Sequence, residues 1–206
     1  MEITIFTLIV LFFSIVIHEV AHGSMALHLG DPTAKSAGRL SLNPLKHIDP
    51  FGTILLPILM LLFTAGRGPI FGWAKPVPIN PYNFRDQKWG TVKVAISGPA
   101  TNFLIAIIFG LLIRFFPLSP LLISLFTIII FYNLLWGLFN LVPIPPLDGS
   151  HILFRFLPER FWKLKMVLQQ YGLFILIFFI FFGLRLLIPL TLYCYQFLTG
   201  QPPLLF

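Results

Sequence analysis

Long runs of apolar residues predict four membrane-spanning helices in this chain. The first run, Ile3–Ile17, holds no charged residue, and its helical pattern continues through a polar cluster to Leu29. At about 1.5 Å per residue, a helix of that length crosses a hydrocarbon core of about 30 Å with some tilt. Three later apolar runs are similar, so the predicted helices cover residues 3–29, 94–116, 121–141 and 166–187.

The segments between these helices are shorter or more polar. The apolar stretch 51–65 is short for a membrane span, and it is predicted to enter and leave on one side as a re-entrant or hairpin element at 51–74. The loops 30–50 and 72–80 are expected to hold a few short β-strands. Residues 73–80 fit an edge strand, since proline cannot donate to a central ladder, and a proline-rich surface loop is the alternative.

Composition places the whole chain, residues 1–206, in one integral-membrane domain. Apolar residues make up 57% and charged residues 10% of the sequence, whereas a soluble domain is about 25% charged. The predicted fold class is therefore an all-α polytopic membrane protein, and soluble nucleic-acid-binding or dinucleotide-binding domains are excluded. The single cysteine, Cys194, excludes a disulfide framework and a cysteine-based zinc site. The first helix lacks the flanks of a removable signal peptide, so it is expected to remain in the protein.

The first predicted helix carries a motif that can bind a metal ion. His18, Glu19 and His22 form the pattern H-E-x-x-H, and residues four apart share one face of a helix, so both imidazoles can hold one ion. Glu19 lies about 100° further round the helix, where it can act on water at the metal without being a ligand. A chance match to this short pattern is the alternative. Charged groups at the centre of a bilayer cost about 2.5–3.5 kcal/mol each, so these side chains need a partner such as zinc.

A catalytic zinc ion usually has three protein ligands and an open position for water. Asp148 is the best candidate for the third ligand, because it follows a membrane helix that is broken by the prolines of NLVPIPP. His151, three residues further on, is the alternative ligand. Asp148 could also be an ordinary turn residue without a ligand role, since Asp-Gly is a common turn dipeptide. The remaining acidic and histidine residues are weaker candidates, namely Glu2, His28, Asp31, His47, Asp49, Asp86 and Glu159. His28 lies on the wrong face of the first helix.

The distribution of basic residues gives an independent test of such a site. If the three ligands hold one ion, the first and third helices end near the same membrane face, and residues 30–93 cross the membrane an even number of times. The loops 30–50, 66–93 and 150–165 then share one side and hold 12 of the 14 Lys and Arg residues. Since basic loops face the cytosol, the site is predicted toward the cytosol and the N-terminus outside.

Two motifs occur together in this chain, HEVAHG at 18–23 and NLVPIPPLDG at 140–149. Three further segments accompany them, which are GRLSLNPLKHIDPFG, FGWAKPVPIN and SGPATN. Over residues 14–155 this set resembles the site-2 protease family, the intramembrane zinc metalloproteases of peptidase family M50, in its compact prokaryotic branch without PDZ or CBS domains. The resemblance implies that one Zn²⁺ is held by His18, His22 and Asp148, that Glu19 is the catalytic acid and base, and that Asn140 lies near the scissile carbonyl.

The function implied by this resemblance is hydrolysis of peptide bonds within or near transmembrane segments. The expected partners are a transmembrane protein or peptide substrate and the lipid bilayer, not nucleic acid, and the expected location is a prokaryotic plasma membrane. Residues 73–80 would capture an extended substrate by β-augmentation. Asn102 is interpreted as structural, making a helix-start or interhelical hydrogen bond. The alternatives are a membrane metal-ion transporter and a homologue that binds helices without cleaving them.

Overall fold

The computed structural model describes residues 2–63 and 72–202, and every regular element in these residues is helical. Four helical stretches are long and apolar enough to cross a membrane, which confirms that part of the predicted fold class. They are α1 (Glu2–His28), α4 (Gly90–Phe115), α5 (Pro120–Asn140) and a last stretch made of α7 (Trp162–Phe178), the π-helical η5 (Phe179–Gly183) and α8 (Leu184–Thr199).

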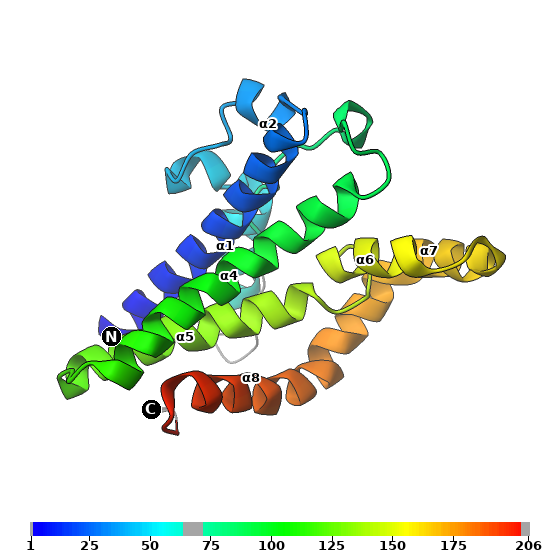
Figure 1. Ribbon diagram of the computed structural model, residues 1–206. Coiled ribbons are helices and arrows are strands. Elements are labelled where there is room, and N and C mark those ends of the chain that lie inside the picture. Colours follow the sequence, from blue (N-terminus) through cyan, green and yellow to red (C-terminus); the bar gives the residue numbers. More distant parts are fainter. Residues whose placement is uncertain (1, 64–71, 203–206) are drawn as a thin grey trace.

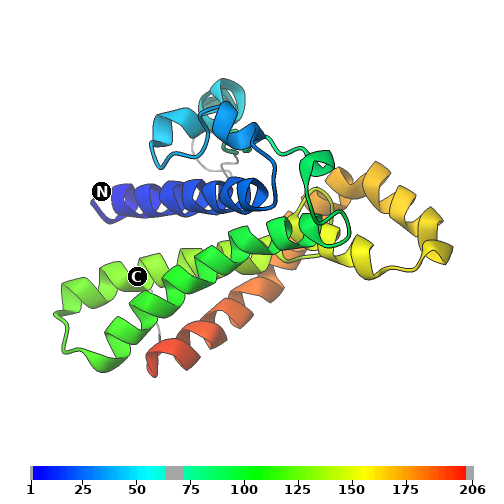
Figure 2. The ribbon, with the colours of Figure 1, turned by 45° about the horizontal axis from the view of Figure 1, so that its top comes forward.

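Shorter helices occupy the connections between the long ones. Between α1 and α4 they are α2 (Thr33–Ser36), η1 (Pro44–His47), η2 (Pro50–Leu55), α3 (Leu56–Phe63) and η3 (Pro81–Asn83). Between α5 and α7 they are α6 (Asp148–Phe156) and η4 (Glu159–Phe161). The segment from α1 to α4 lies mostly beside α1, whereas α6 and the start of α7 project from the side of the bundle (Figures 1 and 2).

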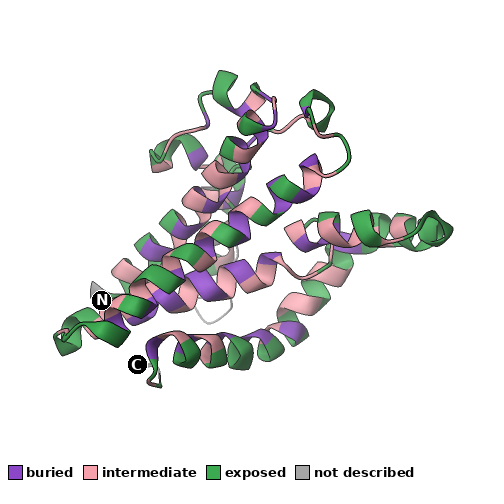
Figure 3. Cartoon of the chain, viewed as in Figure 1, coloured by how far each residue is buried: buried purple, intermediate pink, exposed green. Residues whose placement is uncertain are grey.

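Helices α1, α4 and α5 pack together as the centre of the bundle, and α8 lies along α4 and α5 (Figures 1 and 2). Glycine permits the close approach of α4 and α5, because a Cβ atom on Gly137 would lie 2.9 Å from the ring of Phe103. Figure 3 shows buried residues on the faces where these helices meet and exposed residues on the outer faces. Those outer faces carry large apolar side chains such as Leu8 and Leu104, as a surface in contact with lipid tails requires.

The last helical stretch extends beyond its predicted end at Leu187. It continues to Thr199, because the five-residue π-helical turn η5 changes its direction and α8 then finds partners on α4 and α5. The hydroxyl groups of Thr127 and Tyr195 lie 2.8 Å apart in this interface, and the Arg114 guanidinium donates to the Phe197 carbonyl at 3.0 Å. Residues 188–199 therefore form a packed helix beyond the predicted end of the span.

Residues on the two sides of the predicted element at 51–74 contact each other. The backbone N–H of Trp73 donates to the carbonyl of Gly52 at 3.2 Å, and the Trp73 ring lies 5.9 Å from that of Phe51. Residues 64–71 of the predicted element at 51–74 lie outside the described residues. The two flanks of this element therefore meet, and its re-entrant or hairpin course stays a prediction.

The predicted short β-strands in the loops 30–50 and 72–80 are wrong for the part of the chain that the structure describes, where these residues form short helices, turns and extended coil. In the 72–80 segment the backbone finds partners other than a neighbouring strand. The carbonyl of Lys75 accepts from the Arg39 guanidinium, and the N–H of Lys75 donates to the His47 carbonyl at 2.9 Å. Prolines at alternate positions of this segment lack the N–H that a strand ladder needs.

Asp31 ties the end of the extended segment to the end of α1. Its carboxylate accepts from the backbone N–H of Asn80 at 2.7 Å and from the side-chain amide of Asn83 at 2.8 Å. The hydroxyl and backbone N–H of Thr33 also donate to it. Burial by itself would raise the pKa of Asp31, but the hydrogen bonds from Thr33, Asn83 and Asn80 outweigh burial and hold this pKa below its ordinary value.

We expect Asp31→Asn to lower the free energy of unfolding by about 1–3 kcal/mol, because an amide NH₂ would face the N–H of Asn80. The pKa of Asp31 is lower in the folded than in the unfolded chain. Its stabilisation is therefore present above the unfolded pKa of about 3.9 and is lost as the pH falls below it. Thermal unfolding of both proteins in detergent checks this. Equal melting temperatures at neutral pH, or a difference that grows in acid, would contradict it.

Candidate metal centre

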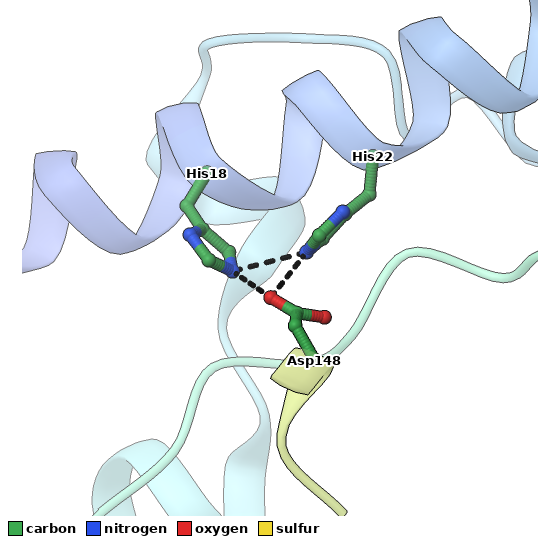
Figure 4. A group of neighbouring side chains, drawn as sticks. All are labelled: His18, His22 and Asp148. Carbon is green, nitrogen blue, oxygen red and sulfur yellow. Dashed lines mark hydrogen bonds and ion pairs between the residues drawn. The ribbon is translucent and has the colours of Figure 1, made fainter. Parts of the chain in front are cut away.

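Two imidazoles and one carboxylate from distant parts of the sequence meet inside the bundle (Figure 4). Oδ2 of Asp148 lies 3.1 Å from Nε2 of His18 and 3.2 Å from Nε2 of His22, and the two Nε2 atoms are 3.0 Å apart. Both histidines are buried, and Oδ2 of Asp148 has no hydrogen-bond donor. This is the only group of three or more potential metal ligands among the residues that the structure describes.

The second nitrogen of each imidazole reveals where its proton lies. Nδ1 of His22 is 2.7 Å from the backbone carbonyl of Val94, which can only accept, so Nδ1 carries the hydrogen and Nε2 of the neutral ring carries a lone pair. Nδ1 of His18 is 2.7 Å from Oδ1 of Asn102, and the same reasoning applies. With both rings neutral, three electron-pair donors therefore converge on one point.

Such an arrangement fits a cation. Ligands at a tetrahedral zinc ion with bonds of about 2.0–2.1 Å lie roughly 3.4 Å from one another, close to the separations of the three donor atoms. Two imidazole nitrogens and a carboxylate oxygen are a donor set that zinc accepts, and three protein ligands leave a fourth position open. The orphaned buried Oδ2 of Asp148 gains its missing partner when an ion is present.

Each ligand owes its place to local sequence. His18 and His22 are four residues apart on α1 and so project from one face of it. Asp148 is the first residue of α6, directly after a proline-rich turn that ends α5 at Asn140. Gly149 lets α6 begin close to the end of α5, because a Cβ atom there would lie 2.2 Å from the Leu141 carbonyl oxygen.

Helix α4 supplies the wall behind the imidazoles without providing a ligand. A Cβ atom on Gly98 would lie 2.6 Å from the His22 ring and 2.7 Å from the His18 ring. Glycine is the residue whose lack of a side chain lets the α4 backbone approach both rings. The Val94 carbonyl and the Asn102 side chain, one turn to either side, take the Nδ1 protons.

Glu19 has a partner of its own in the extended segment. Its Oε2 accepts from the backbone N–H of Val77 at 2.8 Å, and Val77 is buried. Glu19 lies between the two histidines in sequence, but in the described part of the structure its carboxylate pairs with this backbone N–H and not with the group around Asp148. The carboxylate of Asp148 thus faces the imidazoles, whereas the carboxylate of Glu19 is held by the extended segment.

The other candidate residues from the sequence lie outside the group of three ligands. Asn140 is buried at the end of α5, and its amide donates to the Trp136 carbonyl at 3.0 Å. His151 lies on α6 and lines the same cavity as His22 and Asp148, but it is exposed and does not join the ligand group among the described residues. His28 is exposed at the end of α1.

Two cavities border the site. One, of about 240 Å³, is lined by His22, Asp148 and His151 together with residues of the 79–84 loop and the start of α4. The other, of about 740 Å³, is lined almost wholly by apolar residues from α1, α3, α5, α7, η5, the start of α8 and the start of the extended segment. Trp136 belongs to the second cavity, and its ring lies 6.4 Å from that of His18. The smaller cavity thus includes two of the three candidate ligands in its lining, and the larger one reaches the tryptophan whose ring neighbours that of His18.

Sequence reasoning missed three contributors to this site. The interhelical hydrogen bond expected of Asn102 exists, since its amide donates to Asn133 at 2.9 Å, but its contact with His18 has no sequence signal beyond a lone polar residue in an apolar helix. Gly98 belongs to the SGPATN segment, which entered the sequence analysis only as part of the resemblance and gave no sign of its contact with the two histidines. The N–H of Val77 is a backbone group that no side-chain pattern predicts.

Comparison with known proteins agrees with this geometry. The sequence profile of Peptidase family M50 matches residues 118–182. The protein named "Putative zinc metalloprotease YwhC" of Bacillus subtilis is 40% identical over 176 residues, which are 81% of this chain and 76% of that protein. "Putative zinc metalloprotease Rip2" of Mycolicibacterium smegmatis is 28% identical over 80% of this chain and 62% of its own length. "Zinc metalloprotease MJ0392" of Methanocaldococcus jannaschii is 29% identical over 76% of this chain and 36% of its own length.

No solved structure matches the chain. The relatives align over most of this sequence, so the similarity is not confined to one short motif. The names of these relatives agree on the metal and on the kind of reaction, and the ligand group provides donors that suit that metal. The chain therefore belongs to peptidase family M50 and is a zinc metalloprotease whose cofactor is Zn²⁺.

Proposed function

We propose that this protein hydrolyses peptide bonds within or near the transmembrane segments of membrane-protein substrates. The observation that carries the proposal is the burial of the ligand group between helices that are long and apolar enough to cross a membrane. In this proposal His18, His22 and Asp148 hold one zinc ion. A site built at that depth acts on chains that are also in the membrane.

Zinc, when bound, supplies a Lewis acid that polarises a carbonyl group and lowers the pKa of water. Glu19 accepts the proton of the attacking water and returns it to the leaving amine, as general base and then general acid. The hydrogen bond from Val77 keeps one oxygen of this carboxylate occupied, which leaves the other free for proton transfer. Asn140 uses one amide hydrogen on the Trp136 carbonyl and has a second to donate to the oxyanion that forms at the scissile carbonyl.

The two cavities suit the two reactants. Water enters through the cavity that His22, Asp148 and His151 line, because this route carries polar side chains. An apolar substrate segment occupies the larger cavity and reaches the site past Trp136. A helical segment has to unwind locally there before a carbonyl can approach the ligand group, since its backbone is otherwise hydrogen-bonded within the helix.

We further propose that the site faces the cytosol and that the N-terminus lies outside, in a prokaryotic plasma membrane. The contacts of Asp148 and Val94 with the α1 histidines support this orientation, because they set the start of α4 and the segment after α5 beside the C-terminal half of α1. The loops before α4 and after α5 hold most of the Lys and Arg residues, and basic loops are retained in the cytosol.

Labelling of single cysteines introduced at Lys35 and Ser119 of a chain with Cys194→Ser tests this orientation, because the proposal places the two positions on opposite sides.

We expect Asp148→Ala to reduce bound zinc well below one ion per chain, because it removes one of three ligands. Elemental analysis of the purified protein in detergent measures the ratio. His151→Ala is the matched control, since this residue lines the same cavity without joining the ligand group, and it should retain zinc. Unchanged zinc in Asp148→Ala with loss in His151→Ala would make His151 the third ligand.

Glu19→Gln should keep zinc and the fold and lower the rate of peptide cleavage by at least about 100-fold, because the amide cannot accept the proton. The assay measures cleavage of a model transmembrane peptide by reconstituted protein, with zinc content determined on the same sample. Normal turnover by a zinc-loaded Glu19→Gln protein would remove Glu19 from the mechanism. Absence of cleavage by the wild type across a panel of such peptides, with zinc bound, would favour a homologue that binds helices without cutting them.

Val77→Pro should lower kcat by about tenfold to 100-fold, because proline lacks the N–H that donates to Glu19, and such a bond is worth about 1.5–3 kcal/mol. The flanking prolines already favour the extended backbone that a further proline needs. Val77→Ala is the matched control, since it shortens the side chain and keeps the N–H. Equal loss of cleavage in both variants would show that packing of Val77, not its N–H, matters.

A further inference from the structure

Asn102 makes a complete set of hydrogen bonds in the interior of the bundle. Its Nδ2 donates to Oδ1 of Asn133 at 2.9 Å and to the backbone carbonyl of Ser14 at 3.1 Å. Its Oδ1 lies 2.7 Å from Nδ1 of His18. Asn102 and Asn133 are both buried, so water does not compete for these groups. One side chain of α4 thus joins α1, α5 and a proposed zinc ligand.

The orientation of the Asn102 amide follows from these partners. The Ser14 carbonyl can only accept, so the NH₂ group of Asn102 faces it. Asn133 donates its own Nδ2 to the Ile129 carbonyl at 2.9 Å, which turns its Oδ1 toward Asn102. The Oδ1 of Asn102 is therefore left facing His18. An acceptor in that position requires His18 to carry its proton on Nδ1, and Nε2 then has the lone pair that a metal needs.

The two histidines differ in the group that accepts the Nδ1 proton. The Nδ1 proton of His22 goes to the Val94 carbonyl, a backbone group that stays in place whatever side chain α4 carries. The Nδ1 proton of His18 goes to a side chain. A free imidazole side chain prefers the opposite tautomer, with the proton on Nε2. His18 therefore depends on Asn102 for both its tautomer and its ring orientation, and Asn102 depends on Asn133 for its own.

We propose that Asn102, oriented by Asn133, is a positioning residue that prepares His18 to bind zinc before the metal arrives. This inference rests on the proposed role of His18 as a ligand. The role differs from that of an interhelical hydrogen bond, which would stabilise the bundle without setting the tautomer. Loss of a partner that orients a metal-bound histidine typically weakens metal affinity by about 10–100-fold.

The tautomer is measured first in the metal-free wild-type protein. Nitrogen NMR of isotope-labelled histidine in detergent micelles, at a pH where imidazoles are neutral, distinguishes protonated from unprotonated ring nitrogens. The His18 signals are assigned by their loss in His18→Gln. We expect Nδ1 of His18 to be protonated and Nε2 unprotonated. A His18 that carries its proton on Nε2 overturns the proposal, and this result needs neither zinc nor a variant of Asn102.

Zinc affinity is then compared in three variants by competition with a chelating indicator. Asn102→Leu keeps the approximate size of the side chain and removes all its hydrogen bonds, and we expect the zinc Kd to rise about 10–100-fold. Asn102→Asp keeps an acceptor for His18, so it should recover most of the affinity that Asn102→Leu loses. Asn133→Leu should raise the Kd less than Asn102→Leu, because the acceptor remains but is no longer held in one orientation.

Thr127→Val is the matched control. It breaks a buried hydrogen bond with Tyr195 in the same bundle, away from the ligand group, and should lower the melting temperature without changing the zinc Kd. An equal rise in Kd for Thr127→Val and Asn102→Leu, or equally weak binding by Asn102→Leu and Asn102→Asp, overturns the proposal. A wild-type protein that binds no zinc would instead contradict the proposed function, while the tautomer of metal-free His18 still decides this inference.

Discussion

The structure depends on the meeting of three electron-pair donors in an apolar bundle. Two imidazole nitrogens and a carboxylate oxygen lie 3.0–3.2 Å apart, and when both rings are neutral such a group is repulsive without a cation. An ion satisfies all three donors at once. Much of the surrounding architecture can be understood as a means of holding these atoms at this separation where water is scarce.

Helix α4 is the element on which that arrangement rests, although it contributes no ligand. Within about two turns it presents a backbone carbonyl to one imidazole, a glycine to both rings and an amide to the other imidazole. A polar side chain inside an apolar helix is costly unless it is satisfied, and Asn102 uses each of its hydrogen-bonding atoms. The helix therefore joins packing of the bundle to preparation of the site.

The extended segment 72–80 shows how a loop without a strand ladder can still be ordered. Its backbone is held by the guanidinium of Arg39, the carboxylate of Asp31 and the carboxylate of Glu19, each from a different part of the chain. Charged side chains replace the carbonyl and N–H groups that a second strand would offer, and prolines remove donors that would otherwise need partners. The hydrogen bond between Glu19 and the N–H of Val77 therefore has two effects. It holds the proposed catalytic carboxylate in place, and it helps to order the 72–80 segment.

The sequence by itself determined the helical class, the four apolar helices and the three ligand candidates. Apolar runs of bilayer length have few other solutions, and the spacing of His18 and His22 fixes their common face. Only the tertiary structure decided that Asp148 rather than His151 meets them, that the 72–80 segment forms no strand, and that the last helix reaches Thr199. It also revealed Asn102, Gly98 and the Val77 N–H as neighbours of the site. These depend on contacts between residues far apart in the chain, and hydrophobic periodicity carries no information about which distant atoms meet.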